Sequence, residues 1–220
     1  MAEKIIFDTD PGIDDALALL LLAASPEVEL LAITVTHGNT SQDKCLRNAL
    51  QLVELAGITH VPVARGASEP LVKELSVAEE THGDGGLGYA QLPPSSQKPD
   101  GLLAHDLIID LVEKNPGEIT LLCVGPMTNI ALAFLKKPSI AGKVKKIISM
   151  GGAIHYPGNA TPQSEYNVFC DPEAFDIVLN AGIECILVPL DVTYKCIFTT
   201  EHLARITKAR SDVKKFIDDS

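Results

Sequence analysis

The sequence has few basic residues relative to its acidic ones, and this imbalance limits its partners. Eighteen Lys and Arg stand against 29 Asp and Glu, which gives a formal net charge of -11. A surface with that charge repels a polyphosphate backbone and an anionic membrane alike. We therefore expect neither a nucleic acid nor a membrane as a partner.

Long apolar runs and an N-terminal targeting pattern are also lacking. The longest apolar stretch, residues 16–24, is far shorter than the roughly 20 residues of a membrane-spanning helix. Residues 1–4 lead into a strand-like run without the charged-then-apolar pattern of a signal peptide. The five cysteines form no C-x-x-C pair and mostly sit in apolar runs, as reduced thiols do. We expect a cytoplasmic protein without a zinc site.

Strand-like and helix-like segments alternate along the 220 residues. The strand-like runs are apolar throughout, as strands buried on both faces are, and cover residues 4–7, 30–35, 119–124, 144–150 and 184–188. Helical patterns mark residues 14–24, 41–56, 102–112, 129–135 and 172–180. This alternation predicts a single α/β domain over 1–220, with a mostly parallel open sheet and helices on both faces, as in Rossmann-like folds. Long connections at 66–100 and 151–171 are typical of functional loops.

Four aspartates crowd the end of the first predicted strand, in the run DTDPGIDD at residues 8–15. Open parallel sheets bind ligands at this end of their strands. Asp14 and Asp15 alone would suit a helix N-terminus, where carboxylates cap free N–H groups. All four together repel one another unless a cation compensates. Carboxylates without a nearby His or Cys favour calcium or magnesium over zinc.

The run DTDPGIDDALAL resembles the N-terminal signature of the inosine-uridine preferring nucleoside hydrolases. Further matches keep the family's order: Gly38-Asn39, HGDGGLG at 82–88, VGPMTN at 124–129, MGG at 150–152, Asn159, and EYNVFCDPEA at 165–174. The similarity runs from Lys4 to about Tyr194. It implies the fold predicted above and calcium-dependent hydrolysis of ribonucleosides to ribose and free base, in purine and pyrimidine salvage, by a homodimer or homotetramer.

The resemblance also implies roles for individual residues. Asp10, Asp15 and the main-chain carbonyl of Val124 would hold the calcium, and Asp10 would accept a proton from water. The sugar hydroxyls would meet Asp14, Asn39, Asn159, Glu165 and Asn167, with Met150 lining the pocket. Chemical reasoning agrees, because cleavage of an N-glycosidic bond builds positive charge on the sugar and needs water on the opposite face. His82 lies in a glycine-rich loop, where an imidazole can meet the base or aid its departure.

The resemblance ends before the chain does. The family's C-terminal region carries a His-Asp pair that adds a calcium ligand and protonates the leaving base, but the residue directly after His202 is Leu203 and not an aspartate. We therefore expect the chain to lack the C-terminal part of the family's full-length domain. This leaves open a non-catalytic protein that binds nucleosides or ribose. A haloacid-dehalogenase-like phosphatase is a second alternative, since such enzymes place an Asp-x-Asp pair, here Asp8 and Asp10, after the first strand with magnesium.

Overall fold

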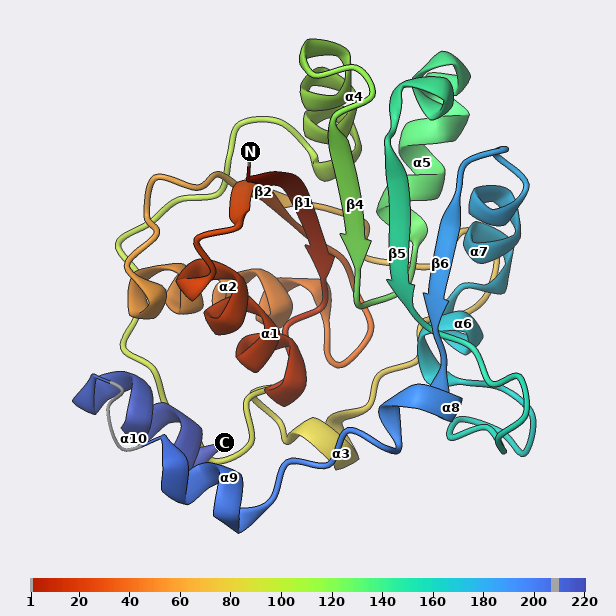
Figure 1. The fold of residues 1–220 in the computed structure, drawn as a ribbon. Helices are drawn as coiled ribbons and strands as arrows, with labels where there is room; N and C mark the ends of the chain where they lie inside the picture. Colours follow the sequence, from red (N-terminus) through yellow and green to blue (C-terminus); the bar gives the residue numbers. More distant parts are fainter. Residues whose placement is uncertain (1, 207–209) are drawn as a thin grey trace.

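A six-stranded sheet organises the computed structural model, which describes residues 2–206 and 210–220. The strand order is β3-β2-β1-β4-β5-β6, and every neighbouring pair is parallel (Figure 1). The strands are β1 (Glu3–Thr9), β2 (Val28–Val35), β3 (Val63–Arg65), β4 (Ile119–Cys123), β5 (Lys146–Met150) and β6 (Cys185–Val188). The predicted α/β class with an open parallel sheet is confirmed.

Helices cover both faces of this sheet, as the apolar strands predicted. On one face, α4 (Ala104–Lys114), α5 (Thr128–Lys136) and α7 (Pro172–Leu179) share a core with Ile6. On the other face, α1 (Ile13–Ala24) and α2 (Gln42–Ala56) share a core with Phe7. Ile6 and Phe7 are consecutive and both fully buried, because side chains alternate between the faces of a strand and both faces are covered here.

The residues that end α2 and begin α7 are those that the sequence predicts. Gly57 ends α2 in the left-handed conformation at φ 76°, which a residue without a side chain adopts at no steric cost. Asp171 caps α7, since its carboxylate accepts a hydrogen bond from the N–H of Ala174, and Pro172 is the first helical residue. Both predicted boundaries are confirmed.

The short elements escaped prediction. The three residues of β3 are too few to show a period. The predicted strand at 144–150 begins two residues early, because the 3-10 helix η1 (Pro138–Lys143) and its connection precede β5. The long connections contain α3 (Glu79–His82) and α6 (Tyr166–Cys170), and the last part of the chain adds α8 (Leu190–Thr193), α9 (Thr200–Arg205) and α10 (Ser211–Asp219). None of the helices in 2–206 and 210–220 has the length and apolar character needed to span a bilayer.

The order of the strands places a ligand site. The chain builds outward from β1 through β2 to β3, and then returns to β1's other side to build β4, β5 and β6. Strand order therefore reverses between β1 and β4, and a crevice opens at such a point beyond the carboxyl ends of the strands. The aspartate run leaves β1 at this position. Figure 1 shows α3, α6 and α8 gathered at the same end of the sheet.

Candidate active site

A cavity of about 480 Å³ lies at the carboxyl end of the sheet. Of the residues proposed from the family resemblance, all but Asp10 line it: Asp14, Asp15, Asn39, His82, Val124, Met150, Asn159, Glu165 and Asn167. Its size falls in the range of small-molecule sites. The fold thus brings together six separated sequence motifs around one cavity.

Sequence reasoning missed several lining residues. They are Ser76, Val77, Ala78, Glu80, Thr81, Ala160, Tyr166, Phe169 and Tyr194. Three of them are next to a recognised position: Thr81 precedes His82, Ala160 follows Asn159, and Tyr166 lies between Glu165 and Asn167. Tyr194 is different, because it comes from the end of α8 and only the three-dimensional fold brings it to the cavity.

Asn39 joins two buried carboxylates, those of Asp10 and Asp15, and Asp15 lines the cavity. The backbone N–H of Asn39 donates to Oδ2 of Asp10 at 2.7 Å, and its side-chain Nδ2 donates to Oδ2 of Asp15 at 2.9 Å. Thr9 Oγ1 and the N–H of Gly12 also donate to Asp15, at 2.6 and 3.0 Å. These bonds fix both carboxylates without a basic partner.

Burial without a neutralising charge shifts the pKa of both groups. Burial raises the pKa of Asp15 to about 7, and the negative charge of Asp14 adds to this shift. The pKa of Asp10 also lies well above its ordinary value, because of burial first and the charge of Asp15 second. Two such groups side by side favour a cation between or beside them.

Two glycines make room for the Asp10 carboxylate. A Cβ atom at Gly38 would overlap Oδ2 of Asp10, and one at Gly125 would overlap Oδ1. Gly38 also has φ +150°, a backbone conformation that residues other than glycine rarely adopt. The close approach of the Asp10 carboxylate therefore explains the glycines of the Gly38-Asn39 and VGPMTN motifs.

The donor set at this point fits a hard cation. Oδ1 of Asp10 is buried and has no hydrogen-bond partner. Oδ1 of Asp15 accepts one hydrogen bond, and so does the carbonyl oxygen of Val124, from Nδ2 of Asn167 at 2.9 Å. Each of these three oxygens keeps a free lone pair, and oxygen is the ligand that calcium prefers. No group of three or more His, Cys, Asp or Glu side chains within 2–206 and 210–220 is arranged to hold a metal, so the carbonyl and outside oxygens would have to complete the coordination.

Glu165 organises the opposite wall of the cavity. Its Oε1 accepts from the N–H of Asn167 at 2.9 Å, and its Oε2 accepts from the N–H groups of Val168 and Gly152, both at 3.1 Å. Burial raises the pKa of Glu165, and the backbone hydrogen bonds oppose that shift. Glu165 therefore caps α6 and ties it to the end of β5, a structural task that the sequence did not reveal.

The asparagines present complementary groups to the cavity. Both Nδ2 hydrogens of Asn39 are used, on Asp15 and on the carbonyl of Asp10, so its Oδ1 is the free acceptor. Asn159 uses Oδ1 to accept from the N–H of Tyr166 at 2.8 Å, so its Nδ2 is the free donor. Nδ2 of Asn167 contacts the carbonyls of Val124 and Met150, which leaves Oδ1 as an acceptor. Such a set suits hydroxyl groups, which both donate and accept.

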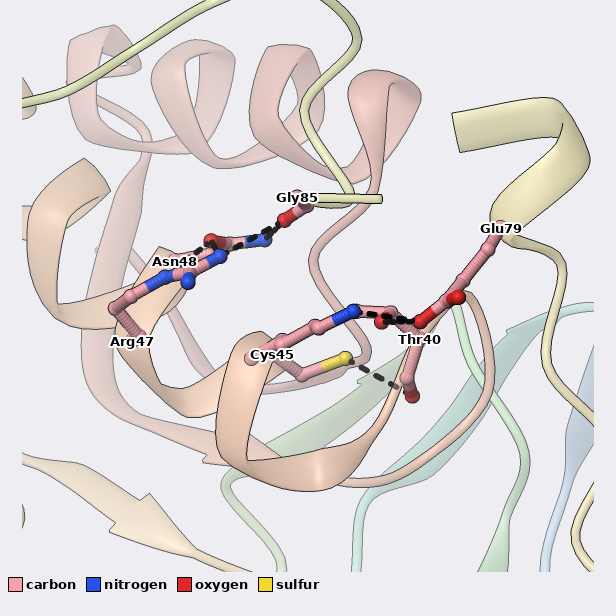
Figure 2. Close-up of polar contacts among 7 residues, drawn as sticks. Thr40, Cys45, Arg47, Asn48, Glu79 and Gly85 are labelled. Atoms are coloured by element: carbon pink, nitrogen blue, oxygen red, sulfur yellow. Dashed lines mark hydrogen bonds and ion pairs between the residues drawn. The ribbon is translucent and has the colours of Figure 1, made fainter. Parts of the chain in front are cut away.

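His82 reaches the cavity from α3, and its loop is tied to α2. Glu79 accepts hydrogen bonds from Thr40 Oγ1 at 3.0 Å and from Lys44 Nζ at 2.8 Å. Figure 2 shows this contact together with a second one, in which the carbonyl of Gly85 accepts from Arg47 and Asn48. The loop from 79 to 85 is thus held at both ends, and His82 lies between the two anchors.

Comparisons with known proteins identify the family that the sequence motifs resemble. The family model described as inosine-uridine preferring nucleoside hydrolase matches residues 5–220. The chain is 43% identical over 218 residues to uridine nucleosidase 1 of Arabidopsis thaliana, and the aligned residues make up 99% of this chain and 65% of the relative. It is also 43% identical over 219 residues to the inosine-uridine preferring nucleoside hydrolase of Leishmania major, covering 99% of this chain and 69% of that protein.

Solved structures agree with the sequence relatives. A plant nucleoside hydrolase superposes with a TM-score of 0.94 at 38% identity, over 99% of this chain and 69% of that one. A purine-preferring ribonucleoside hydrolase from Gardnerella vaginalis gives a TM-score of 0.93 at 36% identity, over 99% and 70%. The chain spans about two thirds of the length of the curated relatives it matches. These matches favour a nucleoside site over the phosphatase alternative.

Proposed function

Because this chain belongs to the inosine-uridine preferring nucleoside hydrolase family, we propose that its cavity binds a ribonucleoside and that its residues hydrolyse the N-glycosidic bond to ribose and free base. The observation that carries the proposal is the buried pair of Asp10 and Asp15, joined by Asn39, beside a cavity lined by three asparagines. These three residues, Asn39, Asn159 and Asn167, are called the asparagine wall. As the family resemblance implies, we propose that the protein acts in nucleoside salvage in the cytoplasm as a homo-oligomer. Relatives of this chain include proteins named for uridine, for pyrimidines and for purines, so the base preference stays open.

Asp10 is proposed to act as the proton acceptor for the attacking water. Its unpartnered Oδ1 is the oxygen available for this, and its raised pKa makes it a better base than an exposed aspartate. Asp10, Asp15 and the carbonyl of Val124 are proposed to hold calcium. The chemistry that a bound calcium ion supplies is a lower pKa for nearby water and positive charge next to the buried carboxylates.

The sugar hydroxyls are proposed to meet the polar wall. Asn39 and Asn167 offer acceptors, Asn159 offers a donor, and Asp14 is exposed on the cavity where it can accept from the 2′-hydroxyl. Met150 lines the space between these groups. Carboxylates around the ring also stabilise the positive charge that develops on the sugar as the bond breaks.

The test is the release of free base. We expect the chain, incubated with calcium and uridine, inosine, cytidine or adenosine in turn, to release base and ribose, measured by liquid chromatography. Asp10→Asn keeps the shape of the side chain and removes the proton acceptor, and should abolish release. The matched control is Asp106→Asn, which changes a surface carboxylate of α4 that pairs with Lys136 of α5. Binding of nucleosides by calorimetry without any turnover would instead establish the non-catalytic alternative.

A further inference from the structure

Two tyrosines form a stacked pair at the rim of the cavity, and the site described so far does not use them. The ring centroids of Tyr156 and Tyr194 lie 4.9 Å apart at an interplanar angle of 25°. Tyr194 lines the cavity and follows α8, whereas Tyr156 lies in the connection between β5 and α6. Both remain about half exposed, at 48% and 46%. Large aromatic rings left exposed beside a cavity are a common feature of binding sites.

The pair is held in place by backbone contacts. Asp191 accepts hydrogen bonds from the N–H groups of Ile154 and His155, at 2.9 and 2.7 Å. The N–H of Leu190 donates to the carbonyl of Gly152 at 2.9 Å. These bonds join α8 to the start of the β5–α6 connection, so the two rings are carried by one braced unit. The N–H groups lower the pKa of Asp191, which keeps this carboxylate charged and accepting.

The other aromatic side chains of the cavity are already engaged. The hydroxyl of Tyr166 donates to the carbonyl of Gly38 at 3.1 Å. The ring of Phe169 carries Nζ of Lys73 over its face, 3.4 Å from the centroid. Tyr194 stacks on Tyr156 and lines the cavity. Among the Phe and Tyr side chains of the described lining residues, it is the one left to receive a planar group.

We propose that Tyr194, backed by Tyr156, is a stacking platform for the nucleobase, while the asparagine wall holds the ribose. This inference rests on the proposed function, because it divides one nucleoside between the two ends of the same cavity. Stacking accepts any planar heterocycle, since every base has a π-face. The platform thus contributes affinity for purines and pyrimidines alike, and Tyr156 is a positioning residue that fixes the angle of Tyr194.

The experiment compares a nucleoside with its sugar alone. Calorimetry in calcium measures binding of D-ribose and of pseudouridine, whose C–C link to ribose is not hydrolysed. Tyr194→Leu should weaken pseudouridine binding by roughly tenfold or more and leave ribose binding unchanged. Tyr194→Phe should keep both affinities, and Tyr156→Leu should weaken pseudouridine only, with rescue by Tyr156→Phe. Tyr89→Leu, a change at a tyrosine that is 93% exposed and outside the cavity, is the control.

Each result decides between the platform and the function beneath it. If wild type binds ribose as tightly as pseudouridine, or if Tyr194→Leu weakens neither or weakens both equally, the platform is overturned and the ribose site stands. If wild type binds neither compound, the proposed function fails and the platform fails with it. A selective loss of pseudouridine in Tyr194→Leu, with Tyr194→Phe unaffected, establishes the platform.

Discussion

The backbone N–H of Ile13, the first residue of α1, donates a hydrogen bond to Nδ1 of His82 at 3.3 Å. This bond leaves the proton of the neutral imidazole on Nε2. Burial lowers the pKa of His82, with the charge of Asp14 opposing the shift, so the neutral ring is the form present near pH 7. A neutral imidazole beside a helix N-terminus can donate a hydrogen bond to a group that gains negative charge. We therefore propose that Nε2 of His82 assists a leaving base.

His82→Asn should separate good leaving groups from poor ones. Assistance to a leaving group is worth about 10²–10⁴ in rate, so kcat for uridine or inosine should fall within that range. A nitrophenyl riboside needs little help and should be cleaved at nearly the wild-type rate. His60→Asn, at an exposed histidine away from the cavity, is the control. Equal losses on both substrates would assign His82 a purely structural role.

Asn48 should matter for substrate binding although it does not line the cavity. Its Nδ2 donates to the carbonyl of Gly85 at 2.8 Å, as Figure 2 shows. It also donates to the carbonyl of Pro11 at 3.2 Å, and so joins the aspartate turn to the His82 loop. Asn48→Ala leaves the buried carbonyl of Pro11 without this donor and the carbonyl of Gly85 with Arg47 alone. This should lower the free energy of unfolding by about 1–3 kcal/mol and raise KM.

The control for Asn48 lies one turn further along α2. Gln51 donates to the carbonyls of Leu92 and Pro93, both at 2.9 Å, outside the cavity. Gln51→Ala should lower stability in urea unfolding and leave KM unchanged. The same KM in wild type and Asn48→Ala would show that His82 keeps its place without this bridge.

The 2′-hydroxyl should control the rate through Asp14. A site built around a hydroxyl rejects the analogue that lacks it by roughly 10⁴-fold, so kcat/KM for 2′-deoxyuridine should fall by about that factor relative to uridine. Asp14→Ala should lower the rate on uridine and shrink the difference between the two substrates. Asp84→Ala, in the exposed part of the neighbouring loop, should keep the full difference. Equal rates on both nucleosides in wild type would remove Asp14 from the sugar site.

The sequence predicts the buried strands and the charged site at the end of the first strand. The apolar runs gave β1, β2, β4 and β6 because burial on both faces requires a continuous apolar segment. The aspartate run predicts a cation-binding site because four crowded carboxylates repel one another unless a cation compensates. Both inferences depend on near neighbours along the chain, where a sequence is most informative.

Contacts between distant segments could not be predicted in this way. The role of Glu165 at the sugar stays a prediction, and its side chain lines the cavity. Its two oxygens also accept from three backbone N–H groups, and residues 165–168 alone do not indicate the contact with Gly152. Tyr194 meets Tyr156 across 38 positions, and no periodicity links them. The amide groups that remain free on Asn39 and Asn159 depend on bonds to other loops. Such features follow from packing and not from pattern.

Calcium should stabilise the chain through Asp10. A ligand that binds only the folded state, at a free concentration a hundred times its Kd, adds about 2.7 kcal/mol to the free energy of unfolding. This appears as a higher Tm in calcium than in chelator. Asp10→Asn should remove the calcium-dependent rise. In chelator, Asp10→Asn should be at least as stable as wild type, because the variant buries no charge beside Asp15. Asp43→Asn, at an exposed carboxylate on α2, should respond to calcium as wild type does. An equal rise in Asp10→Asn would place calcium elsewhere.

A buried histidine should make stability depend on pH. Thr128 Oγ1 donates to Asp171 at 2.7 Å and so accepts from Nε2 of His37 at 3.1 Å, while Nδ1 of His37 is buried without a partner. A proton on Nδ1 would have no acceptor, and burial lowers the pKa of His37 from 6.5 to about 4, with the charge of Asp171 opposing the shift.

The sign of the His37 effect follows from where protons bind. Between pH 6.5 and about 4 the unfolded chain takes up a proton at this position and the folded chain does not, so stability falls as the pH falls. The largest loss is about 3 kcal/mol, from 1.36 kcal/mol per pKa unit. Asp8 and Asp15, with pKa values raised to about 7, act in the opposite direction in the same range. The difference in unfolding free energy between wild type and His37→Gln, measured in urea at several pH values, cancels that contribution. It should decline from pH 7 to pH 4, and a constant difference would show that His37 is protonated equally in both states.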